Sequence, residues 1–108
     1  MIKRIWHGWT TRENADKYFE VLTSKVIPSI EEKKIPGHRE IEVLRKYNGD
    51  EIEFITIITF DSIQNVIDFQ GEDYTRSYVP DVAQAVLKRW DDHCSHYEAI
   101  DWQNYSFR

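Results

Sequence analysis

One β-strand pattern near the middle of the chain carries large apolar side chains on both of its faces. It reads Glu-Phe-Ile-Thr-Ile-Ile-Thr-Phe, and alternation puts Phe54, Ile58 and Phe60 on one face and Ile55 and Ile57 on the other. A lone antiparallel sheet with one face in water would alternate polar with apolar residues. The chain's own helices can cover one face, and the other face needs a second partner. We therefore expect a homodimer that forms sheet to sheet.

The length, the charge and the single cysteine limit the class of protein. A chain of 108 residues has the size of one domain with one core. A formal net charge of −5 argues against nucleic acid or an anionic membrane as a partner. We expect no membrane span, because no stretch approaches the ~20 apolar residues that a span requires. The first residues do not resemble a signal peptide and Cys94 is the single cysteine, so we expect a cytoplasmic protein without an internal disulfide.

The first half of the chain predicts a strand followed by a long helix. Residues 2–9 alternate, and the two faces of this strand carry Ile5, His7 and Trp9 on one side, and Ile2, Arg4 and Trp6 on the other. Thr10 and Thr11 offer an N-cap for the helix. Three- and four-residue steps predict its buried stripe, which consists of Ala15, Tyr18, Phe19, Leu22 and Val26. Pro28 should break or kink the helix near its end, and Ile35-Pro36-Gly37 should stop it.

The second half predicts a hairpin, two further helices and a last strand. Strands over 38–47 and 51–60 flank Asn48-Gly49-Asp50, a strong signal for a tight turn. Asp61-Ser62 should cap a short helix that Gly71 stops. Pro80 suits the first turn of another helix, which is expected to reach Trp90 with an apolar stripe of Val82, Ala83, Val86, Leu87 and Trp90. A last strand is expected over about residues 92–100.

The order β-α-β-β-α-β predicts an α+β fold of the ferredoxin-like type. Four antiparallel strands would form the sheet with helices on one face, and two copies would pair into a dimeric α+β barrel. The domain is expected to span residues 1–101, followed by an aromatic tail over 102–108. The tail contains Trp102, Tyr105 and Phe107, which is unusual for a disordered segment, so we expect it to dock on the partner subunit or over a pocket.

Several short phrases together resemble the antibiotic biosynthesis monooxygenase-like family. They are Ile5-Trp6-His7-Gly8, the central hairpin, Phe60-Asp61-Ser62, and Gly71-Glu72-Asp73-Tyr74 before Pro80. The resemblance covers roughly residues 1 to 100. It implies a homodimeric barrel with a pocket in each subunit between the sheet and the helices. Relatives of this kind include cofactor-free oxygenases that act on phenolic or quinol-type molecules, and haem-degrading oxygenases.

The resemblance to the cofactor-free oxygenases also implies a set of pocket residues. The positions that match their pocket are Asn65, Phe69, Tyr74 and Arg89. Asn65 and Phe69 are four residues apart and would share a helix face. Tyr74 and Arg89 would hold a substrate phenolate, which can react directly with oxygen. The alternatives are ordinary ones: a solvated Asn65, a core Phe69, a Tyr74 that packs over a loop, and an Arg89 that reaches water.

Two residues of the first strand complete the candidate site. His7, a polar ring beside Trp6 and Trp9, needs a partner when buried and could take the proton of a phenol. The alternative is a core histidine bonded to the backbone. Trp6 offers a flat surface on which an aromatic ring could stack.

We expect neither a metal nor another cofactor. His93 and His96 are three residues apart on the predicted last strand, so they point to opposite faces and at most one could join His7. A metal site needs two or three converging ligands. The haem-degrading relatives use a His on the later helix as the iron ligand, and residues 75–90 contain no His.

Two functions of different classes follow. The first is a cofactor-independent monooxygenase-like enzyme that acts on an aromatic or quinol-type small molecule. The second is a non-catalytic dimeric domain that binds a small ligand. The cavity between the sheet and residues 62–90 distinguishes the two functions. An open aromatic pocket with converging polar groups would favour the enzyme, and a pocket filled by Trp6, Trp9 and Phe69 would favour the binding domain.

Overall fold

A computed structural model of the protein describes residues 1–104. Its elements in chain order are β1 (Ile2–Thr11), α1 (Arg12–Val21), the π-helix η1 (Leu22–Val26), α2 (Ile27–Glu32), β2 (His38–Asn48), β3 (Glu51–Phe60), α3 (Ile63–Gln70), α4 (Asp81–Gln84), β4 (Arg89–Trp90) and β5 (Ser95–Glu98). None of the helices in this part of the chain has the length and apolar character that a membrane crossing requires.

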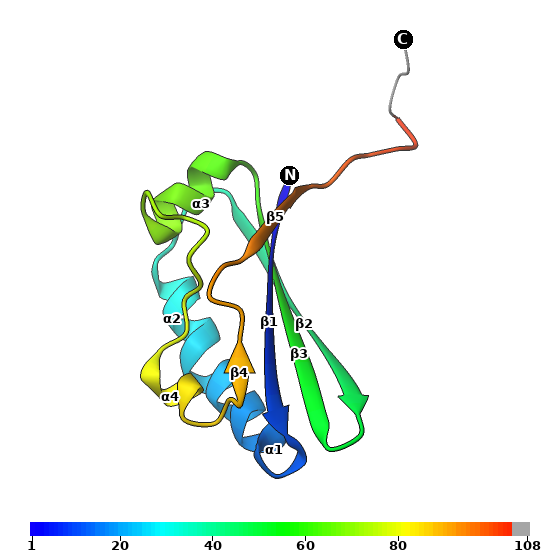
Figure 1. Ribbon diagram of the computed structural model, residues 1–108. Helices are drawn as coiled ribbons and strands as arrows, with labels where there is room; N and C mark the ends of the chain where they lie inside the picture. The colour runs from blue at the N-terminus through cyan, green and yellow to red at the C-terminus, as the bar shows by residue number, and fades with distance from the viewer. Residues whose placement is uncertain (105–108) are drawn as a thin grey trace.

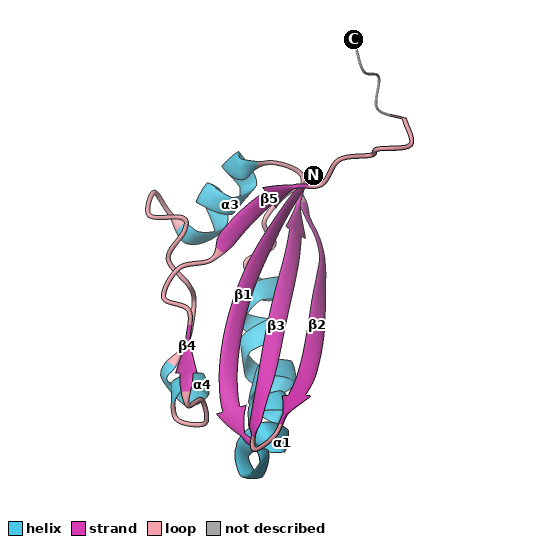
Figure 2. Ribbon diagram, turned by 45° about the vertical axis from the view of Figure 1, so that its right-hand side comes forward, coloured by secondary structure: helices cyan, strands magenta, loops and turns pink. Residues whose placement is uncertain are grey.

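The strands form one antiparallel sheet with the helices on one side. The order is β2-β3-β1-β4, and β5 also pairs with β1. Figure 1 shows the helices along one face of the sheet, and Figure 2 shows β1, β2 and β3 from the opposite face, which no helix of residues 1–104 covers. This arrangement confirms the ferredoxin-like fold. The sheet has five strands rather than four, because the last strand of the fold is divided into β4 and β5.

The two central strands determine which side chains face the helices. β1 and β3 pair over their whole length, from Ile2 opposite Phe60 to Thr11 opposite Glu51. Phe54 and Phe60 point to the helices and are fully buried. Ile55 lies on the outer face and is half-buried. The expected division of β3 into two apolar faces is therefore confirmed.

The first helix begins as predicted and then changes its winding. The Thr11 side chain accepts a hydrogen bond from the Asn14 backbone N–H at 3.2 Å, which caps α1. Pro28 does not break the helix. A π-helical turn comes before it, and Pro28 occupies the first turn of α2, where a missing N–H costs little. The placement of Phe19 in the buried stripe was wrong, since its side chain is 44% exposed.

The predicted hairpin and the short helix after it are confirmed. Asn48 pairs with Glu51, and Gly49 takes a φ of 64° in the turn, a conformation that glycine adopts at no steric cost. Ser62 caps α3 through a reciprocal capping box with Asn65, and Gly71 ends the helix.

The long helix expected from Pro80 to Trp90 was wrong. Its helical part, α4, has four residues, and Arg89 and Trp90 form β4 beside Trp9 and Gly8 of β1. The buried residues of the expected stripe are Ala83 and Leu87, whose spacing suits either arrangement. The edge of β1 decides in favour of the strand, because its backbone groups need partners.

The last strand is shorter than expected because the chain leaves β1 between β4 and β5. In this interval the Cys94 N–H donates to the Thr75 carbonyl at 2.6 Å, and the Ser77 N–H donates to the Asp92 carbonyl at 2.8 Å. After β5 the chain extends away from the domain (Figure 1). Trp102 is 75% exposed in the single chain, and Tyr105 and Phe107 lie outside the described residues, so the docking of the tail stays a prediction.

The Trp6 ring lies across Gly8 on the inner face of β1. A β-carbon on Gly8 would come within 2.8 Å of Cζ3 of Trp6 and closer still to Cη2. Glycine at this position therefore lets the indole lie flat on the strand. The indole nitrogen donates to the Asp91 carbonyl at 3.0 Å, which holds the ring in place.

We predict that Gly8→Ala lowers the free energy of unfolding by about 1–3 kcal/mol, the usual cost of overpacking. Urea denaturation followed by circular dichroism measures this value. In a Trp6→Phe background the same change should cost clearly less, because the smaller ring leaves room for the methyl group. An equal cost in both backgrounds would contradict the steric explanation.

Candidate functional site

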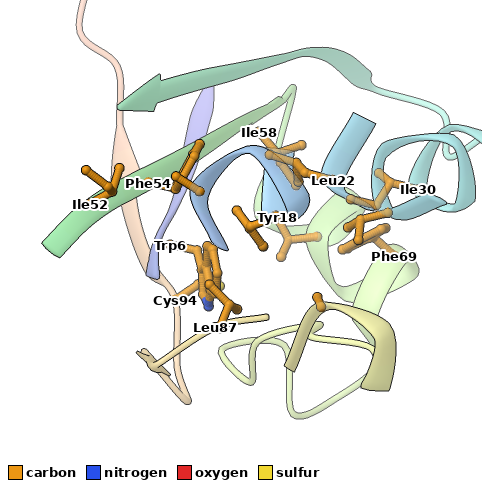
Figure 3. Close-up of a cluster of buried hydrophobic side chains, with 14 of the residues drawn as sticks. Trp6, Tyr18, Leu22, Ile30, Ile52, Phe54, Ile58, Phe69, Leu87 and Cys94 are labelled. Atoms are coloured by element: carbon orange, nitrogen blue, oxygen red, sulfur yellow. The ribbon is translucent and has the colours of Figure 1, made fainter. Parts of the chain in front are cut away.

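A pocket opens between the inner face of the sheet and the helices. Its walls come from β1 and β3, from α1, η1 and α2, and from the segment that leads into α4. Figure 3 shows Trp6, Tyr18 and Phe69, which line this pocket, among the buried side chains of the domain. The cavity between the walls has a volume of about 40 Å³. The pocket has room for a few waters, and a larger ligand requires its walls to move apart.

Arg4 is the charged residue in the pocket wall, and it is almost completely buried. It is 3% exposed. Its Nη1 donates to the Tyr74 carbonyl at 2.5 Å and lies 3.1 Å from Nε2 of His96, while its Nη2 donates to the Arg76 carbonyl at 2.8 Å. Burial lowers the pKa of Arg4 from its usual value, although the neighbouring Cys94 opposes this effect.

The contact with Arg4 determines the protonation state of His96. A guanidinium can only donate, so Nε2 of His96 must be an acceptor and the ring must be neutral. Burial, and then the charge of Arg4, lower the pKa of His96 to about 4. The ring also packs edge-on against Tyr74, with centroids 5.3 Å apart. His96 therefore helps to hold Arg4 and adds no positive charge near neutral pH.

Two further pocket residues, Tyr18 and Cys94, stay protonated near neutral pH. Burial raises the pKa of the Tyr18 hydroxyl well above its usual range. Burial also raises the pKa of the Cys94 thiol, against the opposing effect of Arg4. Both groups can therefore donate a hydrogen bond, and neither supplies a negative charge to the pocket.

Two polar contacts lie on one side of the pocket. One joins the segment before α4 to α2 through Tyr78 and Ser29, and the other joins Lys33, at the end of α2, to α3. The hydroxyls of Tyr78 and Ser29 are 3.0 Å apart. Nζ of Lys33 donates to the Phe69 carbonyl at 3.0 Å and lies 4.3 Å from the centre of the Phe69 ring. Tyr78 belongs to the pocket wall, so its contact with Ser29 holds this part of the wall against α2.

Two of the six predicted site residues line the pocket. Trp6 and Phe69 are buried there. Asn65, one turn before Phe69, instead completes the cap of α3, where its Oδ1 accepts from the Ser62 N–H at 3.0 Å. Tyr74 is half-buried behind Arg4, and its carbonyl, rather than its hydroxyl, makes the contact with that residue.

The other two predicted residues, His7 and Arg89, lie on the outer face of the sheet. Nδ1 of His7 is 2.7 Å from Oε2 of Glu53. Arg89 donates to both carboxylate oxygens of Glu51 at 2.5 and 2.8 Å, and its guanidinium lies over the Trp9 ring. The sheet separates both side chains from the pocket.

The histidines do not form a metal site in the described structure. Across residues 1–104, no three His, Cys, Asp or Glu side chains are placed to share a metal ion. Nδ1 of His93 is 3.0 Å from the Thr75 hydroxyl, whereas His96 contacts Arg4 on the inner face of the sheet.

The sequence reasoning missed Arg4 and Tyr18. Alternation had already placed Arg4 on the same strand face as Trp6, and a charged residue on a face that packs against helices is a signal for a site. Tyr18 was assigned to the buried stripe of the helix, where nothing in its spacing distinguishes a pocket wall from the core.

Comparison with known proteins supports the fold. No model of a protein family matches the sequence, and no curated protein matches it. Among solved structures, the chain is similar to a Bacillus cereus protein described as a putative antibiotic biosynthesis monooxygenase. The two chains share 14% identity at a TM-score of 0.61, and the alignment covers 99% of this chain and 96% of the other. A likeness at this identity establishes the fold alone.

We predict that the stability of the protein falls as the pH decreases from about 6.5 to about 4, in part because of His96. An unfolded chain binds a proton on this ring near its usual pKa of 6.5, whereas the folded protein binds it only near 4, so acid favours unfolding in this window. Solvent screening reduces the effect to about 1 kcal/mol. The loss in melting temperature between pH 7 and pH 5 should be smaller in His96→Gln than in the wild type. His93→Gln is the matched control, and equal slopes in all three proteins would contradict the role of His96.

Proposed function

We propose that the protein binds a small, flat aromatic molecule in this pocket and oxidises it with molecular oxygen, as a cofactor-independent monooxygenase-like enzyme. The pocket itself is the observation that supports the proposal. Four aromatic side chains, Trp6, Tyr18, Phe69 and Tyr78, stand in walls that otherwise contain few polar groups. Such a composition suits a planar, largely apolar ligand.

The chemistry would depend on the electron-rich form of the substrate. For an anthrone, one atom of O₂ becomes the new carbonyl oxygen on the ring carbon, and the other leaves as water with the two hydrogens of that carbon. The substrate is oxidised and O₂ is reduced, so the atoms and electrons balance without a further reductant. The protein would hold the ring, donate hydrogen bonds to its oxygen atom and exclude bulk water.

The proposal assigns these tasks to residues that face the pocket. Trp6 and Phe69 offer stacking surfaces, and the Tyr18 hydroxyl offers a donor. Tyr74 acts through its backbone by positioning Arg4. We leave His7 and Arg89 out of the set, because the sheet stands between their side chains and the pocket.

The alternative is a non-catalytic domain that binds a small ligand. The narrowness of the pocket favours this alternative, because a cavity of about 40 Å³ is far smaller than an aromatic ligand. Binding would then have to move the part of the wall that Tyr78 forms. A ligand held in this way need not be positioned for a reaction.

We also propose that the protein is a homodimer, formed through the outer face of the sheet. This face carries apolar side chains from four strands, namely Ile5, Trp9, Leu44, Ile55, Ile57 and Tyr97. Leu44 and Tyr97 are 46% and 58% exposed in the single chain. Exposed apolar side chains on one sheet face favour burial against a second copy, and no helix of residues 1–104 covers this face (Figure 2).

We predict that Ile55→Lys, at the middle of the outer face, converts a wild-type dimer into monomers or aggregates. A buried ammonium without a partner opposes the association of two apolar faces. Sedimentation velocity at micromolar concentration measures the result. Val82→Lys is the matched control, because Val82 is also exposed but lies on α4. A wild-type protein that sediments as a stable monomer at this concentration would overturn the dimer.

We predict that the wild-type protein consumes oxygen with at least one member of a panel of dihydroxynaphthalenes and anthrones, after treatment with a chelator. Phe69→Leu should mainly weaken binding, by about tenfold, since it removes a stacking surface from the pocket. Phe19→Leu, on the exposed side of α1, is the control. Binding without turnover would leave the ligand-binding alternative, and no binding of any member would contradict both functions.

A further inference from the structure

We infer that Arg4 is the anion-binding residue of the pocket, and that the natural ligand carries an oxyanion on its aromatic ring. The inference deepens the proposed function, since it assumes that the pocket binds an aromatic molecule. It adds the charge of that molecule and the residue that recognises it. The oxyanion is either a phenolate or a carboxylate, which share the same hydrogen-bonding chemistry.

The first argument is that the charge of Arg4 is buried without a counterion. Within residues 1–104, no carboxylate lies within ion-pair distance of its guanidinium, and the groups that it contacts are two backbone carbonyls and a neutral histidine. The more exposed Arg39 and Arg89 each pair with a carboxylate. A buried charge without an opposite charge is costly. An anionic ligand in the pocket would supply the missing partner.

The second argument is the number of donors. A guanidinium has five N–H groups in a planar fork. Tyr74, His96 and Arg76 account for three of these in Arg4. The Nε–H and one Nη2–H remain without an acceptor in the described structure. These two nitrogens are also the ones through which Arg39 binds the carboxylate of Asp61, so the same pair of donors can hold an oxyanion.

The third argument is the electrostatic surroundings of Arg4. Its titratable neighbours in the pocket are neutral: burial keeps the pKa of Cys94 high, and the pKa of His96 is low. Lys33, a cation, lies 4.3 Å from the centre of the Phe69 ring. Asp91 acts on Cys94 through its charge, but it makes no ion pair with Arg4. The field in the pocket therefore favours an anion.

The position of Arg4 relative to the aromatic walls gives the class of ligand. Its guanidinium carbon lies 5.6 Å from the centre of the Phe69 ring, and Trp6 is two residues away on the same strand face. A ligand ring that stacks against these walls places a substituent of its edge at the guanidinium. For a phenol, this contact favours the ionised form, which is the form that reacts with oxygen.

The test uses the wild-type protein with matched ligands. Isothermal titration at pH 7 compares 2-naphthoate, 2-naphthamide and 2-naphthol, which share one ring system. We expect naphthoate to bind at least about tenfold more tightly than naphthamide, as a charge-assisted hydrogen bond predicts. With 4-nitrophenol, whose anion absorbs visible light, the bound ligand should ionise at a pH about one lower than the free ligand. Equal affinities for naphthoate and naphthamide, or unchanged ionisation, would overturn the inference and leave the proposed pocket intact.

Variants assign the effect to Arg4. Arg4→Gln should lose the preference for naphthoate over naphthamide, whereas Arg4→Lys should retain part of it, because the charge persists without the fork. Arg39→Gln, an exposed arginine, is the matched control and should bind like the wild type. A preference that persists in folded Arg4→Gln would overturn the assignment. If Arg4→Gln does not fold, Arg4→Lys and the wild-type titrations decide. Failure of all three naphthalenes to bind would instead overturn the proposed function itself.

Discussion

The pairing of β1 with β3 determines the rest of the structure. The two strands pair over ten residues, and every second side chain of β1 faces the helices. A shift of this register by one residue would exchange the two faces of the strand. It would carry Arg4 and Trp6 to the uncovered side and bring His7 and Trp9 into the core. The location of the pocket and the apolar outer face are therefore two results of one register.

Arg4 links the pocket to a segment that has little regular structure of its own. Residues 71–80 form neither a helix nor a strand apart from a single bridge between Arg76 and His93. Arg4 reaches into this segment and donates to the carbonyls of Tyr74 and Arg76. The order of the segment thus depends in part on a residue that also faces the pocket. A ligand that binds Arg4 would compete with, or reinforce, the hydrogen bonds that hold the segment.

Much of the fold could be predicted from local patterns, because the physics that produces it is local. Alternation gave the strands, Asn48-Gly49-Asp50 gave the hairpin, and Ser62 and Gly71 gave the two ends of α3. The segment 80–90 could not be predicted in this way. Its apolar spacing suits both a long helix and one helical turn followed by a strand, and the edge of β1 that selects the strand is a feature of the assembled sheet. In this segment tertiary hydrogen bonding overrides the helical pattern.

The candidate site was harder to predict than the fold, since it depends on which face of the sheet the helices cover. His7 and Arg89 are chemically suited to bind a phenolate, but alternation puts His7 with Trp9, and β4 puts Arg89 beside that same ring. The side chain of Asn65 does not reach the pocket, because it accepts a hydrogen bond in the N-terminal cap of its own helix, α3. These three residues form hydrogen bonds or ion pairs outside the pocket. Their residue types alone could not predict those partners.

The inner face of the sheet contains a few polar residues that interrupt its apolar surface, and their hydrogen bonds separate structural roles from functional ones. The Thr10 hydroxyl donates to the Val86 carbonyl at 2.6 Å, so its one donor is used and its burial is explained by the fold. Arg4 is almost as deeply buried, yet the fold uses only three of its five donors, and no carboxylate of the described residues pairs with its charge. A residue that is costly to bury, and that its own chain satisfies only in part, indicates a ligand more directly than its residue type does. By this criterion the pocket is organised around Arg4.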